Sequence, residues 1–334
     1  MFKQLYFANK KGVHIKVKYI LSVFLGAASY GILSTIVVLA YGSGYNLGEV
    51  VGSQLLTGFI LAWGLAFVMK WREKRSKGTA SDGSKKTVTG FVSLTWKQRL
   101  LLMAAGTPTA ITGLLYYQSL RYIPASLAII LLFQFTWIGV LIQSLSQRKR
   151  PNGIMFFTIA ILFGGTMLAA GIIEQGAGKF NVMGVVLGLL SAVSYSLFIL
   201  FSGKAVPSVH PAYRSVWMIT GGLILVFIIF PPTFLFNGLI WGDLMLYGFL
   251  LGMFGAFIPP VLFAVGVPHI GEGMAGILGA SELPVAVLLS SFVLNEHVSA
   301  LQWMGVIIVL IGIALPELLK RKKMSVRNGT GISA

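Results

Sequence analysis

Ten uninterrupted apolar runs, each about twenty residues long, constrain this sequence more than any other feature. A bilayer core of about 30 Å needs about 20 apolar residues of helix, so each run is long enough to cross a membrane. A membrane barrel would instead show strands of about ten residues with alternating polarity. The sequence therefore predicts an all-α polytopic membrane protein. The predicted spans are residues 19–41, 49–69, 100–120, 124–145, 154–173, 182–201, 212–232, 243–265, 273–294 and 301–319.

The composition agrees with lipid as the solvent. Hydrophobic residues make up 56% of the chain and charged residues only 10%, whereas an ordinary soluble domain carries about 25% charged residues. The sequence has no cysteine, and its four histidines are scattered. We therefore expect no disulfide scaffold, no metal site and no cofactor.

The lysines and arginines predict the orientation of the chain. If the N-terminus is cytoplasmic and the spans alternate, all but two of the 26 basic residues fall on the cytoplasmic side; the exceptions are Arg121 and Lys179. This is the positive-inside distribution of membrane proteins. It predicts a plasma-membrane protein with both termini in the cytoplasm. Orientation and contact with the lipid bilayer also explain the net charge of +17 without nucleic-acid binding.

An internal repeat divides the chain. Gln134 matches Glu282 at a spacing of 148 residues, and the pair Ser29-Tyr30 matches Ser194-Tyr195 at a spacing of 165. Units of five spans must run in opposite directions because five is odd, so we expect ten transmembrane helices as two inverted five-helix repeats, as in many secondary transporters. The predicted segments are a cytoplasmic N-terminus (1–18), a first repeat (19–173) with a basic loop (70–99), a second repeat (182–319) and a basic tail (320–334).

Two short segments carry a family resemblance. Ala-Ser-Glu-Leu-Pro at 280–284 and Asn-Glu at 295–296 resemble the EamA-type repeat of the drug/metabolite transporter superfamily. Residues 122–165 resemble it as well, but Gln134 and Trp137 stand where the repeat has its glutamate and proline. The resemblance implies ten spans and membrane transport. It leaves the solute open among amino acids, other metabolites, drugs and sugars.

Glu282 is the first candidate for a functional residue. It lies near the centre of a predicted span, where an ionised carboxylate costs about 2.5–3.5 kcal/mol. It is either a proton-coupling group or counter-charge for a solute, or a structural acid bonded to backbone freed by Pro284. Gln134 and Trp137, on one helix face, can bind a solute or bond a neighbouring helix.

Tyr30 and Tyr195 complete the candidate central cavity. Each lies near mid-membrane in the first span of its half, where a tyrosine hydroxyl needs a partner from a solute, water or another helix. Prolines that interrupt the spans predict hinges of moving elements or static kinks. These prolines are Pro108, Pro259, Pro260 and Pro284.

The sequence thus predicts a secondary active transporter, not an enzyme, that moves small organic solutes by alternating access as a monomer or homodimer. Export follows from the resemblance alone, and a proton is one candidate coupling ion. The chain has no Gly-x-x-x-x-Gly-Lys-Ser/Thr loop for direct use of ATP. A passive channel or facilitator and a membrane-embedded lipid-modifying enzyme are the alternatives, and the latter lacks a cluster of acids or histidines.

Overall fold

The computed structural model describes residues 2–79, 94–146, 153–171, 181–202, 204–206, 209 and 211–329. Within these residues the chain is helical and has no strand. The helices of the first half are α1 (Phe2–Gly31), α2 (Leu33–Gly42), α3 (Leu47–Thr79), α4 (Trp96–Ser119), α5 (Ala125–Leu132), α6 (Phe135–Ser146) and α7 (Gly153–Ala169). Those of the second half are α9 (Val182–Ser202), α10 (Pro211–Ile229), η2 (Thr233–Leu235), η3 (Leu239–Trp241), α11 (Asp243–Gly252), η4 (Met253–Phe257), α12 (Ile258–Ile270), α13 (Glu272–Gly279), α14 (Glu282–Val293) and α15 (Ala300–Gly329).

Six helical segments are long and apolar enough to cross a membrane. They are Val17–Gly42, Leu47–Arg72, Trp96–Ser119, Val182–Ser202, Asp243–Ile270 and Met274–Val293. Four shorter apolar helices are Ala125–Gly139, Phe156–Ala169, Tyr213–Ile229 and Ala300–Leu315. Each predicted run overlaps one of these segments. The all-helical, multi-pass class is thereby confirmed, while the ten-span inverted repeat stays a prediction.

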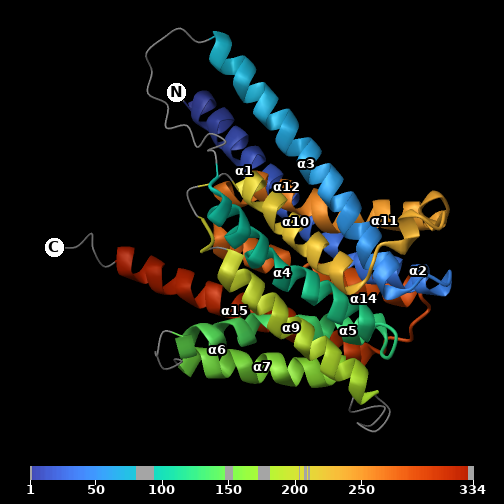
Figure 1. Cartoon of the computed structure of the whole chain (residues 1–334). Coiled ribbons are helices and arrows are strands. Elements are labelled where there is room, and N and C mark those ends of the chain that lie inside the picture. The colour runs from blue at the N-terminus through green and yellow to red at the C-terminus, as the bar shows by residue number, and fades with distance from the viewer. Residues whose placement is uncertain are drawn as a thin grey trace.

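Helices from opposite halves of the chain pack against each other throughout the bundle. α4 packs against α9 and α10, α1 against α12, α3 against α10 and α11, and α7 against α15. Figure 1 shows these helices as one bundle, in which α1 begins and α15 ends at the same end. The interior therefore lies between the two halves rather than within each half.

Glycines bring the helix backbones together at two crossings. A Cβ atom on Gly106 of α4 would overlap the backbone of Met218 in α10, and one on Gly305 of α15 would overlap the backbone of Ala169 in α7. Small residues at such crossings are how membrane helices reach close van der Waals contact.

Two of the predicted spans are broken at matching places. α5 ends at Leu132 and α6 begins at Phe135, so Gln134 lies at the break; α13 ends at Gly279 and α14 begins with Glu282. Discontinuous helices in corresponding positions of the two halves are typical of the binding region of secondary transporters.

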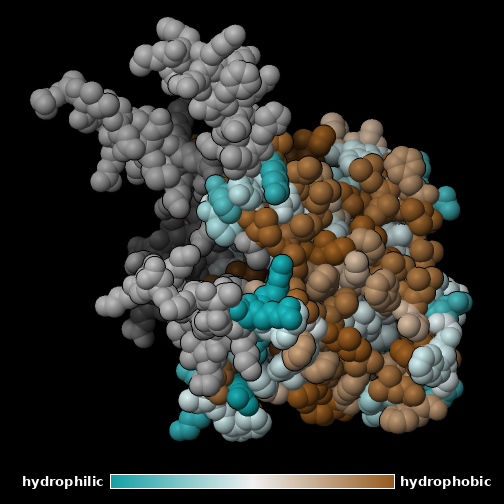
Figure 2. Space-filling model, turned by 90° about the horizontal axis from the view of Figure 1, so that it is seen from above, coloured by the Kyte–Doolittle hydropathy of each residue, from teal (hydrophilic) through white to brown (hydrophobic). Residues whose placement is uncertain are grey.

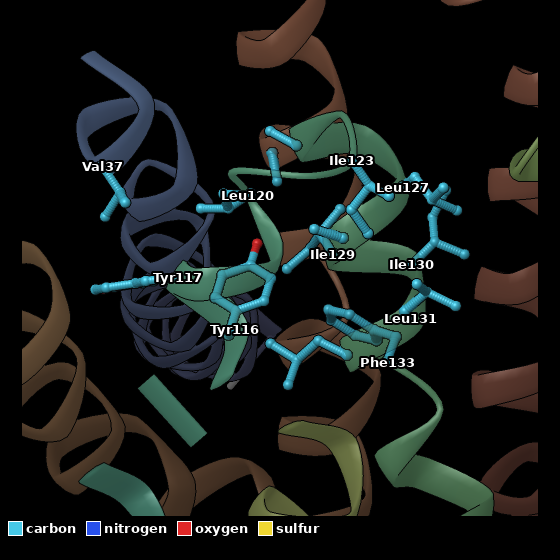
Figure 3. Close-up of a cluster of buried hydrophobic side chains, with 14 of the residues drawn as sticks. Val37, Tyr116, Tyr117, Leu120, Ile123, Leu127, Ile129, Ile130, Leu131 and Phe133 are labelled. Atoms are coloured by element: carbon cyan, nitrogen blue, oxygen red, sulfur yellow. The ribbon is translucent and has the colours of Figure 1, made fainter. Parts of the chain in front are cut away.

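The core lies around α5, whose eight residues are all buried. Figure 3 shows two neighbouring tyrosines of α4 that point in opposite directions: Tyr117 toward Val37 of α2, and Tyr116 toward α5. Both tyrosine side chains are buried. The core therefore joins the end of α4 to helices on both of its sides.

The outer surface is apolar, as a lipid-facing surface must be. Ile228 of α10 is 74% exposed and Phe292 of α14 is 78% exposed. On the face shown in Figure 2, hydrophobic residues cover a broad band of the described surface, with hydrophilic residues toward its borders. A soluble protein rarely exposes so large an apolar patch, so this face fits a bilayer.

Candidate functional site

Glu282 opens α14 directly after the break that follows α13. The N-terminus of a helix carries a partial positive charge that favours a carboxylate. The side chain is half-buried, and its carboxylate makes no hydrogen bond within the described part of the chain. A carboxylate without such a bond can meet a proton, a water molecule or a solute.

The structure brings Tyr30 of α1 and Tyr195 of α9 to the same place. Each phenol interacts electrostatically with the Glu282 carboxylate, and the two phenols interact with each other. Both side chains are half-buried, and neither hydroxyl has a hydrogen-bond partner among the described residues. Three of the five predicted binding residues thus lie within electrostatic range of one another, and we call them the central trio: Tyr30, Tyr195 and Glu282.

Two further tyrosines, both on α4, lie near Glu282. Tyr116 and Tyr117 each interact electrostatically with its carboxylate. The pair lies at the C-terminal end of α4, and aromatic residues at the end of a span usually mark the membrane interface. No local pattern distinguishes the two roles, because the approach of α4 to α14 is a tertiary feature.

Unbonded hydroxyls extend this polar region toward α2. The hydroxyls of Ser34, Thr35 and Tyr116 are buried and have no hydrogen-bond partner within the described residues. Tyr116 and Ser34 lie next to each other without forming a bond of normal geometry. Buried polar groups are nearly always bonded to protein or ordered water, so these three can serve a water molecule or a polar solute.

Gln134 and Trp137, the other two predicted binding residues, bond to the protein itself. The Trp137 indole donates to Gln134 Oε1 at 2.7 Å, while Gln134 Nε2 donates to Ile130 O at 2.9 Å and to Thr166 Oγ1 at 2.7 Å. Gln134 is 4% exposed. The amide therefore holds the break between α5 and α6 against α7.

Two serines that precede the tyrosines join the halves of the chain. Ser29 Oγ of α1 donates to Phe254 O of η4 at 3.0 Å. Ser194 Oγ of α9 donates to Pro108 O of α4 at 2.8 Å. Each bond runs from the first span of one half to the third span of the other, and both fix the helix turn that carries a trio tyrosine.

The predicted prolines occupy three kinds of place. Pro108 lies inside α4, and the nearby Ala104 carbonyl accepts from Thr107 Oγ1 at 2.9 Å. Pro259 and Pro260 lie in the first turn of α12, directly after the π-helical η4. Pro284 lies in the first turn of α14, where backbone N–H groups have no intrahelical acceptor. It therefore removes no helix hydrogen bond, and the break before Glu282 interrupts this span instead.

Glu296, between α14 and α15, forms a clasp on α5. Its carboxylate accepts from Ala125 N at 2.6 Å, from Ser126 N at 3.1 Å and from Ser126 Oγ at 2.7 Å. Charge-assisted bonds to a helix N-terminus are among the stronger protein hydrogen bonds. No local sequence pattern reveals this contact, because the partner lies about 170 residues away in the chain.

An apolar groove of about 560 Å³ lies beside the central trio, between α1, η4 with α12, and α14. It does not include the trio side chains, but Ser29 and Val285 on its wall are close to them in sequence. Its rim is exposed at Leu25 and Leu288. The lining residues are Leu25, Ala28, Ser29, Ile32, Phe254, Ile258, Leu262, Val285, Leu288 and Leu289.

Comparison with known proteins finds similarity to membrane transporters. Residues 182–316 match the model of the EamA-like transporter family. An uncharacterized transporter of Synechocystis sp. is 26% identical over 207 residues, which are 60% of this chain and 61% of that protein. The match thus spans about three fifths of the curated relative. A solved crystal structure with 15% sequence identity superimposes with a TM-score of 0.59, covering 92% of this chain and 99% of that one; it bears on the fold alone.

Proposed function

This chain is an EamA-type member of the drug/metabolite transporter superfamily, and on that premise we propose that it is a secondary active transporter. It exports small organic solutes through the membrane by alternating access. The observation that carries the proposal is the central trio: a carboxylate and two phenols that have no hydrogen bonds to the described residues, drawn from α1, α9 and α14. Groups left open in this way at mid-span are what a solute or a coupling proton requires.

The packing supports two inverted five-span repeats. α1 and α9 belong to the first spans of the two halves, and α4 and α12 belong to the third spans. An inverted repeat predicts that the first span of each half contacts the third span of the other half. Both contacts, α1 with α12 and α9 with α4, occur. The Ser29–Phe254 and Ser194–Pro108 hydrogen bonds correspond in the same way. The breaks that precede α6 and α14 fall 147 residues apart, within one residue of the spacing of the sequence repeat. The solute site then lies where the repeats meet.

Sidedness follows from the charges. The end of the bundle where α1 begins and α15 ends is the cytoplasmic end, since the basic segments lie there, and the Glu296 clasp closes the opposite end. The plasma membrane is the proposed location. In this arrangement Glu282 exchanges a proton for the solute.

Counterflow in proteoliposomes tests the proposal. Vesicles that contain the wild-type protein and are loaded with unlabelled solute should accumulate labelled solute transiently, with a saturable initial rate. A carrier does this because its single site faces the two sides by turns. A panel of amino acids, other metabolites and lipophilic drugs supplies the probes. A non-saturable flux without counterflow would identify a channel, and a chemically altered solute would identify an enzyme; either result would contradict the proposal.

A change of Glu296 to glutamine should open the clasped end of the bundle. The amide keeps one acceptor oxygen but loses the charge that strengthens three hydrogen bonds, so the clasped state should lose about 1 kcal/mol, roughly a fivefold population shift. The native chain has no cysteine, so a Ser34→Cys reporter gives a single labelling site near the central trio. Its labelling rate from the clasped side should rise about fivefold.

Glu49→Gln is the matched control for this experiment. Glu49 is also a carboxylate at a span end, but it bonds only to Asn46 within its own helix start. Its substitution should leave the labelling rate of Cys at position 34 unchanged. Equal rates in wild type and Glu296→Gln would show that the clasp does not control access.

A further inference from the structure

An arginine and tryptophan cluster lies at the end of the bundle opposite the Glu296 clasp. Arg99 of α4 lies over the ring of Trp217 of α10, with 5.2 Å between its guanidinium carbon and the ring centroid. Arg214 lies one turn before Trp217 on α10 and donates from Nη2 to Ser202 O at the end of α9. The cluster thus joins the starts of α4 and α10 to the end of α9.

Three N–H donors in this cluster have no acceptor in the part of the chain that the structure describes. Arg99 Nε, Arg214 Nε and Trp217 Nε1 are buried and lack a hydrogen-bond partner there. The neighbouring Trp63 shows the contrast, because its indole donates to Thr220 Oγ1 at 3.2 Å. Bulk water cannot satisfy donors that are shielded from solvent, whereas an ion or a water molecule held at the site would satisfy them.

The charge of the cluster is also uncompensated. Arg99 and Arg214 are both the fourth residue of their helix, near the positive end of the helix dipole, where a cation is unfavourable. Neither arginine forms an ion pair with an acidic side chain in the described ranges of the chain. Two cations, two positive helix ends and three open donors together require an anion.

We propose that this cluster binds a phosphate group, with an anionic phospholipid as its source. A guanidinium matches phosphate oxygens in a bidentate geometry, and an indole N–H can add a third bond. The lipid is favoured over free phosphate by the surface beside the cluster. Leu100 and Leu101 of α4 are 47% and 55% exposed and offer apolar contact to acyl chains.

The exposed Trp96, at the first turn of α4, lies at the level typical of head groups. A buried apolar cluster that includes Leu94, Leu102 and Met218 closes the protein side of the site. The head group would then hold α4, α9 and α10 together at the end that we assign to the cytoplasm, where anionic lipids attract basic groups. The phosphate site itself does not depend on the transport activity proposed above.

Lipid binding to the full-length protein in detergent micelles tests the proposal. The probes are phosphatidylglycerol, zwitterionic phosphatidylcholine and inorganic phosphate, and the readouts are native mass spectrometry and the melting temperature. Phosphatidylglycerol should bind and raise the melting temperature, and phosphatidylcholine should do so less. Arg99→Gln and Arg214→Gln should each weaken phosphatidylglycerol binding about tenfold, the loss expected for one hydrogen bond to a charged group.

Two more variants keep the test decisive if the arginine variants fold poorly. Trp217→Phe keeps the aromatic contact but removes the indole donor, and should weaken binding about fivefold. Lys97→Gln removes an exposed cation from the same turn of α4 and should leave binding unchanged.

Each remaining outcome is informative. Inorganic phosphate that competes with phosphatidylglycerol, with the same dependence on Arg99 and Arg214, would support the phosphate site and name free phosphate as a second source. Equal binding of phosphatidylglycerol to wild type, Arg99→Gln, Arg214→Gln and Trp217→Phe would overturn the proposal. A loss in Lys97→Gln as large as in the arginine variants would also overturn it, because it would show only diffuse surface attraction.

Discussion

Glu282→Gln should abolish proton-driven transport while leaving the protein folded in the membrane. The carboxylate is the only acidic member of the central trio, and its lack of a hydrogen bond to the protein leaves it free to exchange a proton. Glutamine has nearly the same size and cannot ionise. Coupling free energies between two ligands are typically 1–3 kcal/mol, a factor of about 5–150. We therefore expect proton-gradient-driven solute flux to fall about 100-fold and to lose its dependence on pH.

Proteoliposomes with an imposed pH gradient measure this effect, and counterflow without a gradient provides the second readout. A coupling role predicts that gradient-driven flux disappears, whereas solute exchange between the two sides persists if Glu282 does not hold the solute. Loss of both would assign Glu282 to solute binding as well. Asp243→Asn, which removes an exposed carboxylate at the start of α11, is the control. Unchanged pH dependence in Glu282→Gln would disprove the coupling role.

Gly305→Val should destabilise the bundle at the crossing of α7 and α15. Any Cβ at position 305 would overlap the backbone of Ala169 and the carbonyl of Gly165. A backbone cannot move aside as a flexible side chain can, so the two helices must separate and lose contact along their length. Overpacking typically costs 1–3 kcal/mol, and we expect about 3 kcal/mol here, measured as a lower melting temperature in detergent.

Gly164→Ala is the matched control. Gly164 is a helical glycine of α7, the partner of α15 at this crossing, but no atom lies near the position of its Cβ. Alanine has the higher helix propensity by up to about 1 kcal/mol, so this variant should be as stable as wild type or slightly more stable. If both substitutions changed the melting temperature equally, the crossing would not be the cause.

The sequence predicts the fold class well, because a membrane span requires a long apolar run that local composition reveals. All ten runs contain an apolar helical segment. The breaks inside the spans are harder to predict. Pro284 drew attention to its span, but the break precedes it at Ala280 and Ser281. Gln134 lies at a break with no proline nearby in the chain. A break of this kind depends on tertiary contacts that compensate the lost helix bonds.

The candidate site is predictable only in part for the same reason. Glu282, Tyr30 and Tyr195 stand out because polar groups are costly at mid-membrane, and the structure places them together. Gln134 and Trp137 stand out equally in the sequence, yet their polar atoms bond to each other and to Thr166. A sequence shows that a polar group needs a partner, but the partner comes from the packing. The Glu296 clasp leaves no local signal in the sequence, because its partner is distant in the chain.

The paired serine bonds have a consequence for how such a bundle could rearrange. Ser29 ties the first span of one half to η4 of the other, and Ser194 ties α9 to α4. A body that moves as one unit would therefore combine helices from both halves of the chain. We expect the hinges of the conformational cycle to lie inside each half of the polypeptide. The midpoint of the chain would then not be the boundary between the moving bodies.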